Sequence, residues 1–403
     1  MKRRFNDHRY EYLRLAAFVA AIGFSAPTYA DDWPLVRGDT LGSGVARKPL
    51  SDKLDVLWTY HAPGDSGFDA TPVVAGGIVY IGDSDGTFDA VRLADGTTVW
   101  TKKLGDAGFL AGAAWDQGRL YVGDANGVVR CLSAEDGSEV WRADVGAEVY
   151  AGPMIHDQDV LVTCEAGTLA CFDAATGKER WHFHIEAPLR CTPTIVAGQA
   201  LLAGCDSKLH LIDVSSGIEA NNVGIDAPTG ATPAARDNRV YFGTEGGTFY
   251  AIELSAGSDK PPVVAWTYRD PERSQPIRAA AAANEHLVAY GAQGKAVVGL
   301  NPANGKPLWT QPTPSRVDSS PVIAGERVVA ATDRGVLYLI DAKSGEVKWQ
   351  FEAGGHFAGS PAVVDGRIVI ANADGTLYCF GAKDIDNKKD QINHEDAKDT
   401  KKK

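Results

Sequence analysis

The sequence lacks the features of a helical protein. Among 403 residues it has only 2 methionines, and no stretch places apolar residues at the three-and-four spacing of an amphipathic helix. Glycine and proline are frequent instead, with 44 and 20 residues. This composition excludes a helical solenoid and favours many short strands joined by tight turns. The hydrophobic share of 44% also excludes a chain disordered throughout.

Long hydrophobic runs are scarce, and the clearest one stands near the start of the chain. "LAAFVAAIGF" (15–24) follows a basic segment and precedes "APTYA" (26–30). The run is too short to span a bilayer comfortably. The pattern predicts a signal peptide over 1–30 with cleavage after Ala30, and an uncleaved anchor is the alternative. The first cysteine is Cys131, which disfavours a lipid anchor, so we expect no stable membrane insertion after cleavage.

Positive charge is also in short supply. The whole chain has a net charge of −12, and the leader holds five basic and two acidic residues. Cleavage leaves about −15, which repels phosphate backbones and anionic lipid surfaces. Nucleic acid is therefore excluded as an expected partner, and the export signal predicts a periplasmic or secreted protein.

A repeat of about 40 residues fills most of the chain. Its first landmark is a Ser/Thr-Pro step or a small-residue substitute, at Pro72, Ala113, Pro153, Pro193, Pro233, Ala281, Pro321 and Pro361. About ten residues later comes a tight turn, at Gly86, Gly127, Gly167, Lys208, Gly247, Gly294, Gly335 and Gly375. A second turn follows at Gly96, Gly137, Gly177, Gly217, Gly257, Gly305 and Gly345, usually with tryptophan four residues on. "DAATGKERW" (173–181) is one copy of this second turn.

Alternating segments such as "GIVYIG" and "GRLYVG" lie between the landmarks and predict four short strands in each repeat. The last repeat lacks its fourth strand, while an unmatched strand around Trp58 precedes the first. Pairing these two leaves no free sheet edge. We therefore predict an all-β fold, an eight-bladed β-propeller of four-stranded antiparallel blades closed by the N-terminal strand on the last blade.

The repeat also sets the predicted domain boundaries. The propeller covers 53–381, an N-terminal extension that packs through Trp33 covers 31–52, and 382–403 is a charged tail expected to be disordered. Three of the six cysteines occupy one repeat position, namely Cys131, Cys171 and Cys379. Equivalent places in neighbouring blades are too distant to bridge. Buried free thiols are expected, with a bond among Cys164, Cys191 and Cys205 as the alternative.

The pattern "D-A-x-T-G-K-x-x-W" alternating with "S-P-x-V-x-x-G-x-V" resembles the PQQ-like repeat shared by quinoprotein dehydrogenases and the outer-membrane assembly factor BamB, over about residues 58–380. The resemblance implies that tryptophans dock between adjacent blades. The docking residues implied are Trp58, Trp100, Trp141, Trp181, Trp266, Trp309 and Trp349. Asn221 stands where another tryptophan is expected, and an insertion precedes Trp266.

Motifs for chemistry are few. "DSDGT" (83–87) begins like a calcium loop but lacks its glycine and its terminal acid, so a hairpin turn is favoured. His182 and His184 share one face of a strand, but spacing supplies no third zinc ligand. "GAQGK" (291–295) is an incomplete phosphate loop, and no Gly-x-Ser-x-Gly elbow occurs. No catalytic residue, metal or cofactor is predicted.

The repeat locates one channel mouth. If the strand leading into each proline landmark is innermost, the residue three before each landmark lies near the channel. These residues are Asp69, Leu110, Tyr150, Arg190, Gly230, Arg278, Asp318 and Ala358. A purely structural role would favour small or apolar residues at this position. Four charged residues and one tyrosine depart from that expectation: Asp69, Tyr150, Arg190, Arg278 and Asp318. These five either pair with one another in solvent or bind a ligand or peptide.

Two functions follow as expectations. The first is a non-catalytic, BamB-like binding or scaffold propeller of the cell envelope, monomeric, with an envelope protein or peptide as partner. The alternative is a quinoprotein-type oxidoreductase that binds PQQ with calcium, as the resemblance implies for dehydrogenases of this class. No Cys-Cys step, which many of those enzymes have, occurs in this chain.

Overall fold

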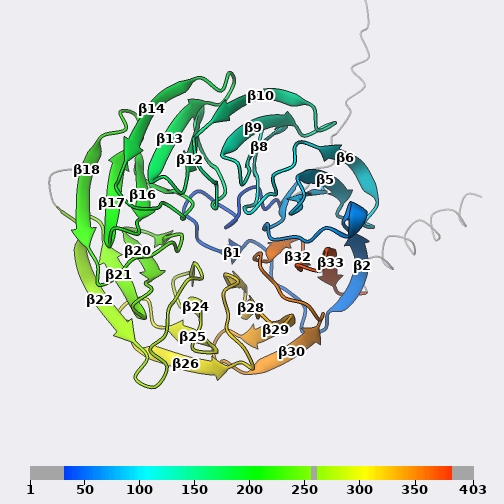
Figure 1. Cartoon of the computed structure of the whole chain (residues 1–403). Coiled ribbons are helices and arrows are strands. Elements are labelled where there is room, and N and C mark those ends of the chain that lie inside the picture. The colour runs from blue at the N-terminus through cyan, green and yellow to red at the C-terminus, as the bar shows by residue number, and fades with distance from the viewer. Residues whose placement is uncertain (1–30, 256–260, 384–403) are drawn as a thin grey trace, which may run out of the picture.

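The computed structural model describes residues 31–255 and 261–383. The predicted signal peptide, most of the charged tail and part of the insertion before Trp266 therefore lie outside the described residues. Within them the chain forms eight sheets arranged radially around a central axis (Figure 1). Regular helix is limited to one 3-10 turn, η1 (Pro63–Asp65), in this part of the chain. The all-β eight-bladed propeller predicted from the repeat is confirmed.

Each blade takes four strands from inside to outside, in chain order, in blades 1 to 6. Blade 1 holds β3 (Val73–Ala75), β4 (Ile78–Gly82), β5 (Thr87–Arg92) and β6 (Thr98–Lys103). Blade 2 holds β7 (Ala114–Asp116), β8 (Arg119–Gly123), β9 (Val128–Ser133) and β10 (Glu139–Asp144). Blade 3 holds β11 (Met154–His156), β12 (Asp159–Thr163), β13 (Thr168–Asp173) and β14 (Glu179–His184).

The next three blades repeat the plan. Blade 4 holds β15 (Thr194–Val196), β16 (Gln199–Ala203), β17 (Lys208–Asp213) and β18 (Glu219–Gly224). Blade 5 holds β19 (Ala234–Arg236), β20 (Arg239–Gly243), β21 (Thr248–Glu253) and β22 (Val263–Arg269). Blade 6 holds β23 (Ala282–Ala283), β24 (Val288–Ala292), β25 (Ala296–Leu300) and β26 (Pro307–Pro312).

The last two blades depart from this plan because N-terminal strands join them. Blade 7 holds β27 (Val322–Ala324), β28 (Arg327–Ala331), β29 (Val336–Asp341) and β30 (Val347–Glu352), and β1 (Val45–Ala46) adds a fifth, parallel strand on its inner edge. Blade 8 holds β31 (Ala362–Val364), β32 (Arg367–Ala371), β33 (Thr376–Gly381) and, outermost, β2 (Asp55–His61). β2 pairs antiparallel with β33, Thr59 opposite Tyr378, as the count of landmarks predicts.

The two kinds of turn account for the recurring glycines of the repeat, because each described turn has a residue with positive φ. At the second turn the glycines all have positive φ where described, between 69° and 76°, a conformation that side chains with a Cβ rarely adopt. At the first turn two sequence assignments were wrong by one residue. Ser207 (φ 63°), and not Lys208, takes the left-handed position in blade 4, and Lys295 (φ 60°) takes it in blade 6 in place of Gly294. Each turn keeps its geometry although the glycine is absent or displaced.

The second turn is also the socket for the preceding blade's tryptophan. A Cβ added to Gly177 would lie 2.5 Å from the ring of Trp141, and one added to Gly217 would lie 2.5 Å from the ring of Trp181. The indole N–H of Trp141 donates to the Ala174 carbonyl at 3.0 Å. The same bond, at 2.9–3.1 Å, anchors Trp58, Trp100, Trp181, Trp266 and Trp309. "DAATGKERW" thus receives one tryptophan and supplies the next.

Two blade junctions differ from the others. Trp349 packs edge-on against Phe380 of blade 8, with ring centroids 5.5 Å apart. Asn221 lies in β18 opposite Leu211, and Gly257, the glycine expected to face it, lies outside the described residues. Trp266 docks like the rest despite the insertion, because the extra residues precede its strand.

The Ser/Thr of the first landmark joins blades near the axis. The Ser360 amide donates to the Thr71 hydroxyl at 2.9 Å, and the Ser320 amide donates to the Ser360 hydroxyl at 3.0 Å. The Ala280–Ser320 and Thr192–Thr232 pairs repeat this bond. A buried amide therefore finds its acceptor on the neighbouring blade.

Candidate functional site

The N-terminal extension forms the floor of the central cavity, which the sequence did not reveal. Residues 31–46, called here the floor segment, run around the axis inside the innermost strands (Figure 1). Trp33 pairs with Val74 of blade 1, and the carbonyls of Pro34, Thr40, Leu41, Ser43 and Gly44 accept amides of blades 2, 4, 5, 6 and 7 in turn. The first residue of the segment completes the circuit at blade 8, where the Asp31 carboxylate accepts a hydrogen bond from the Asp365 amide. Strand edges that face the axis would otherwise stay unpaired.

Two glycines make room for this segment. A Cβ at Gly112 or Gly152 would lie 2.7 or 2.6 Å from Val36. Five of the other six blades carry a hydroxyl residue at the same repeat position, such as Thr192 and Thr232, and blade 6 has Ala280. Blades 2 and 3 therefore have glycine at this position, and the absence of a side chain leaves space for Val36.

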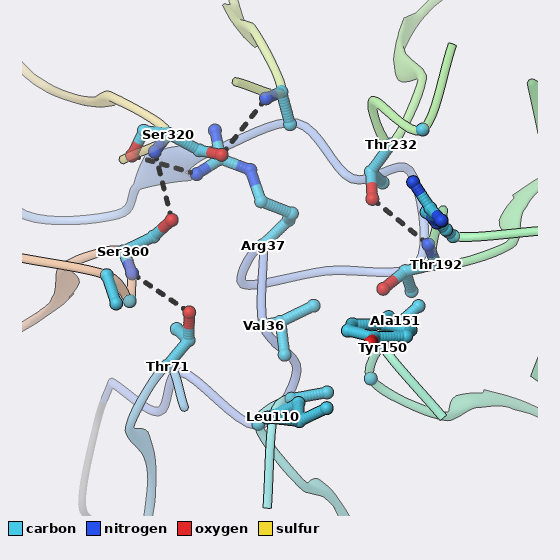
Figure 2. A pocket seen from close by; sticks show the side chains of 18 of the residues that line it. Val36, Arg37, Thr71, Leu110, Tyr150, Ala151, Thr192, Thr232, Ser320 and Ser360 are labelled. Carbon is cyan, nitrogen blue, oxygen red and sulfur yellow. Dashed lines mark hydrogen bonds between the residues drawn. The ribbon is translucent and has the colours of Figure 1, made fainter. Parts of the chain in front are cut away.

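Arg37 fixes the segment on the opposite side. Its guanidinium donates to the carbonyls of Ala281 at 2.9 Å, Pro321 at 2.7 Å and Ser320 at 3.3 Å. Figure 2 shows Arg37 reaching toward Ser320 on one side of the cavity. The residue is 4% exposed, and burial lowers the pKa of Arg37 to about 10, so it remains charged at neutral pH.

The mouth cavity, as we call the hollow above this floor, has a volume of about 200 Å³. Val36 and Arg37 line its base (Figure 2). All eight residues located by the repeat line it too: Asp69, Leu110, Tyr150, Arg190, Gly230, Arg278, Asp318 and Ala358. The assignment of these residues to an innermost strand was wrong, because the innermost strands begin after the landmark and the residues before it are irregular.

Three of the four charged mouth residues are bonded to the preceding blade's first turn, and no bond joins two of these four described residues to one another. Asp69 instead accepts the Ser84 hydroxyl of its own blade at 3.3 Å. Arg190 Nε donates to Glu165 at 2.8 Å, and Arg278 Nε donates to Glu245 at 2.8 Å. These bonds raise the pKa of both guanidinium groups. The Asp318 carboxylate accepts a hydrogen bond from the Gln293 side-chain amide at 3.3 Å and forms an ion pair with Arg316 at 3.0 Å.

A second hollow, the rim cavity, opens beside the first with a volume of about 490 Å³. It shares Tyr150, Arg190, Gly230 and Arg278 with the mouth cavity and adds Cys205, Pro228, Thr229 and Glu245. Tyr150 is 45% exposed, and the Arg190 guanidinium lies 5.7 Å from its ring centroid. Sequence reasoning missed Arg37, Cys205, Glu165 and Glu245. Glu165, Cys205 and Glu245 share one repeat position at the first turn, and this shared position is the sequence signal that could have identified them. Arg37 lies outside the repeat and has no such signal.

The other sequence candidates do not assemble into a site. His182 bonds Glu179 at 2.7 Å and His184 faces Thr168 at 3.3 Å, both on the exposed face of β14. "DSDGT" forms a hairpin turn in which Asp83 accepts the Thr87 amide at 2.7 Å. All six cysteines are free, five of them buried. Burial raises the pKa of Cys191 to about 12.

Comparison with known proteins adds the family. A family model described as outer membrane protein assembly factor BamB matches residues 84–233, 208–322 and 313–388. No curated protein matches the chain. No helix in the described part of the chain is long and apolar enough to cross a membrane.

Solved structures share the fold at low sequence identity. BamB from Moraxella catarrhalis is 17% identical, with a TM-score of 0.70 over 82% of this chain and 98% of that one. Quinohemoprotein alcohol dehydrogenase from Comamonas testosteroni is 16% identical, with a TM-score of 0.72 over 89% and 81%. A europium-containing methanol dehydrogenase is 14% identical, with a TM-score of 0.71 over 87% and 98%. The family matches, which together run from residue 84 to 388, and the eight-bladed fold show that this chain belongs to the BamB family of PQQ-like repeat propellers.

Proposed function

We propose that this protein is a non-catalytic binding propeller of the cell envelope, and that its mouth binds a protein partner. The observation that carries this proposal is the paired arrangement of the mouth. Arg190 and Arg278 are each held by a glutamate of the neighbouring blade, so the surface is formed before any partner arrives. Preformed side chains lose little entropy on binding.

The mouth also has the composition of a recognition surface. An exposed tyrosine next to arginine is frequent where proteins bind one another, because both offer large contact areas with polar groups at their ends. The floor segment lines the base of the cavity with Val36 and Arg37, so we expect a partner to contact the rim and not to thread the ring.

The dehydrogenase alternative requires PQQ with calcium, and the mouth residues do not fit that pair. Calcium takes six to eight oxygen ligands, usually with several carboxylates. Here Glu165, Glu245 and Asp318 are engaged by arginine. No group of three His, Cys, Asp or Glu side chains that could hold a metal occurs among residues 31–255 and 261–383.

A site-specific photo-crosslinker tests the binding proposal. We expect a crosslinker in place of Tyr150 to capture a discrete partner in envelope fractions, and the double change Arg190→Ala/Arg278→Ala to weaken that capture. The matched control replaces Val140, which is 48% exposed on β10 at the outer edge. Equal products from both positions would contradict a role for the mouth.

A second measurement addresses the enzyme alternative. The purified protein is incubated with PQQ and calcium, and absorbance and dye reduction with alcohols are followed. We expect no cofactor uptake and no reduction. Stoichiometric uptake with turnover would replace the binding proposal with an oxidoreductase.

A further inference from the structure

The mouth arginines of blades 4 and 6 flank blade 5, whose mouth residue is a glycine. At blades 4 and 6 a first-turn glutamate of the preceding blade holds the mouth arginine, as Glu165 holds Arg190 and Glu245 holds Arg278. At blade 5 the mouth residue is Gly230, and the facing turn residue of blade 4 is Cys205, whose thiol contacts the Thr229 carbonyl at 3.7 Å. The missing pair leaves the rim cavity between two arginines.

Both arginines are positioned to use their remaining donors. The glutamate bonds engage Nε and Nη2 of each guanidinium. A guanidinium has five N–H donors, so the Nη1 donors remain for a ligand. About half of each side chain is exposed, 51% for Arg190 and 55% for Arg278.

Arg37 adds a third positive charge beneath them. It forms no direct ion pair among the described residues, although the Asp39 carboxylate acts on it electrostatically, and its buried Nε has no hydrogen-bond partner there. A buried charge without a directly paired counter-charge is costly. An anion in the adjoining cavities would reduce that cost.

The ligand that fits is carboxylate-bearing and belongs to a protein. Guanidinium groups match carboxylates in shape and can donate two parallel hydrogen bonds. Tyr150 offers an apolar ring face on the same rim. The net charge of −12 opposes large polyanions such as nucleic acid but not a short segment.

We propose that the rim cavity binds an acidic segment of the partner protein, with carboxylates between Arg190 and Arg278 above Gly230. This inference rests on the proposed function and names the chemistry of its partner. Cys205 lies in the same cavity, so the bound segment covers its thiol. The other cysteines are buried, which makes Cys205 the specific reporter.

The test uses the full-length protein and a capped peptide, acetyl-Glu-Tyr-Glu-amide. We expect saturable binding by calorimetry, at least a tenfold loss in Arg190→Gln and Arg278→Gln, and slower alkylation of Cys205 when peptide is present. The matched control is Arg142→Gln, because Arg142 is also an exposed arginine paired with a glutamate, at 2.6 Å, but lies on β10 at the outer edge. Thermal midpoints verify that the variants fold. Arg190→Lys retains the positive charge but cannot donate two parallel hydrogen bonds to one carboxylate.

Three outcomes would overturn the inference: equal binding of the glutamine peptide acetyl-Gln-Tyr-Gln-amide, unchanged affinity in both arginine variants, or alkylation of Cys205 at the same rate with peptide bound. Inorganic phosphate that displaces the peptide at lower concentration would assign the site to phosphate instead. Crosslinking at Tyr150 is independent of these results. A captured partner without peptide binding would retain the proposed function and reject this inference.

Discussion

Asp89 and Arg130 occupy the same repeat position in blades 1 and 2, with opposite charge. Arg130 pairs with the buried Asp124, whereas Asp89 stands near the buried Asp83. Asp89 is fully buried and accepts the Thr101 hydroxyl at 2.6 Å. Burial raises the pKa of Asp89 to about 6, with Asp83 adding to the rise and bonds from Thr101 and Tyr60 opposing it.

This residue makes the stability of blade 1 dependent on pH. The folded pKa of about 6 lies above the ordinary 3.8, so the unfolded chain ionises first. The contribution of Asp89 to the free energy of unfolding is therefore highest below about pH 4 and is lost as pH rises through about 6. At neutral pH the ionised carboxylate destabilises the fold.

We predict that Asp89→Asn raises the free energy of unfolding at about pH 7.5 by about 1–3 kcal/mol, at 1.4 kcal/mol per pKa unit, and by less at pH 4. Urea denaturation at both pH values measures this difference. The control is Asp95→Asn, because the turn bonds from Thr97 lower the pKa of that exposed carboxyl and give its contribution the opposite pH dependence. A parallel pH profile in wild type and Asp89→Asn would contradict the assignment.

At the scale of elements, blades are joined by repeated contacts of a few kinds. The tryptophan of one outer strand enters the glycine turn of the next blade, and the landmark hydroxyl bonds the amide of its neighbour near the axis. One contact lies at the perimeter and the other near the centre. Adjacent blades are therefore fixed at both ends of their contact.

We predict that Gly177→Ala destabilises the protein more than Gly118→Ala does. Both glycines have positive φ, 70° and 78°, but an added Cβ meets Trp141 at 2.5 Å in the first case and nothing within 4 Å in the second. Backbone strain costs about 1–2 kcal/mol at either site, and displacement of Trp141 adds about 1–3 kcal/mol at Gly177. Urea midpoints measure the difference, and equal losses would show that the indole contributes nothing to the socket.

The whole molecule is held closed at one seam, where β2 completes blade 8. Residues more than 300 positions apart pair there, such as His61 with Thr376, whose side chains lie 3.2 Å apart. Closing so long a loop has an entropic cost that the antiparallel pairs of blades 1 to 7 do not bear, because those strands are consecutive in the chain. The seam is therefore the place where the ring opens first.

We predict that a disulfide in His61→Cys/Thr376→Cys stabilises the oxidised protein by about 2–4 kcal/mol, since it removes loop entropy from the unfolded chain. Unfolding midpoints with and without dithiothreitol measure this effect. The single variants are controls and should not respond to reductant. An unchanged midpoint in the oxidised double variant would show that the seam does not limit unfolding.

The sequence by itself determined the number of blades, the strand that closes the ring and the eight residues around the mouth. It could do so because a repeat of fixed length places equivalent residues at the same distance from the axis. The number of landmarks therefore gives the number of blades, and the position within the repeat gives the place in the blade. The resemblance to the PQQ-like repeat implied that tryptophans dock between blades, and their sockets at glycines such as Gly177 and Gly217 follow the repeat spacing.

Only the tertiary structure decided what lies outside the repeat. The floor segment has no periodicity, and its bonds join residues hundreds of positions apart, as between Arg37 and Pro321. The pairing of Arg190 with Glu165 crosses from one blade to the next, and the gap at Gly230 is visible only once both neighbours are placed. Such contacts depend on how the blades are arranged around the axis, and no local sequence pattern specifies that arrangement.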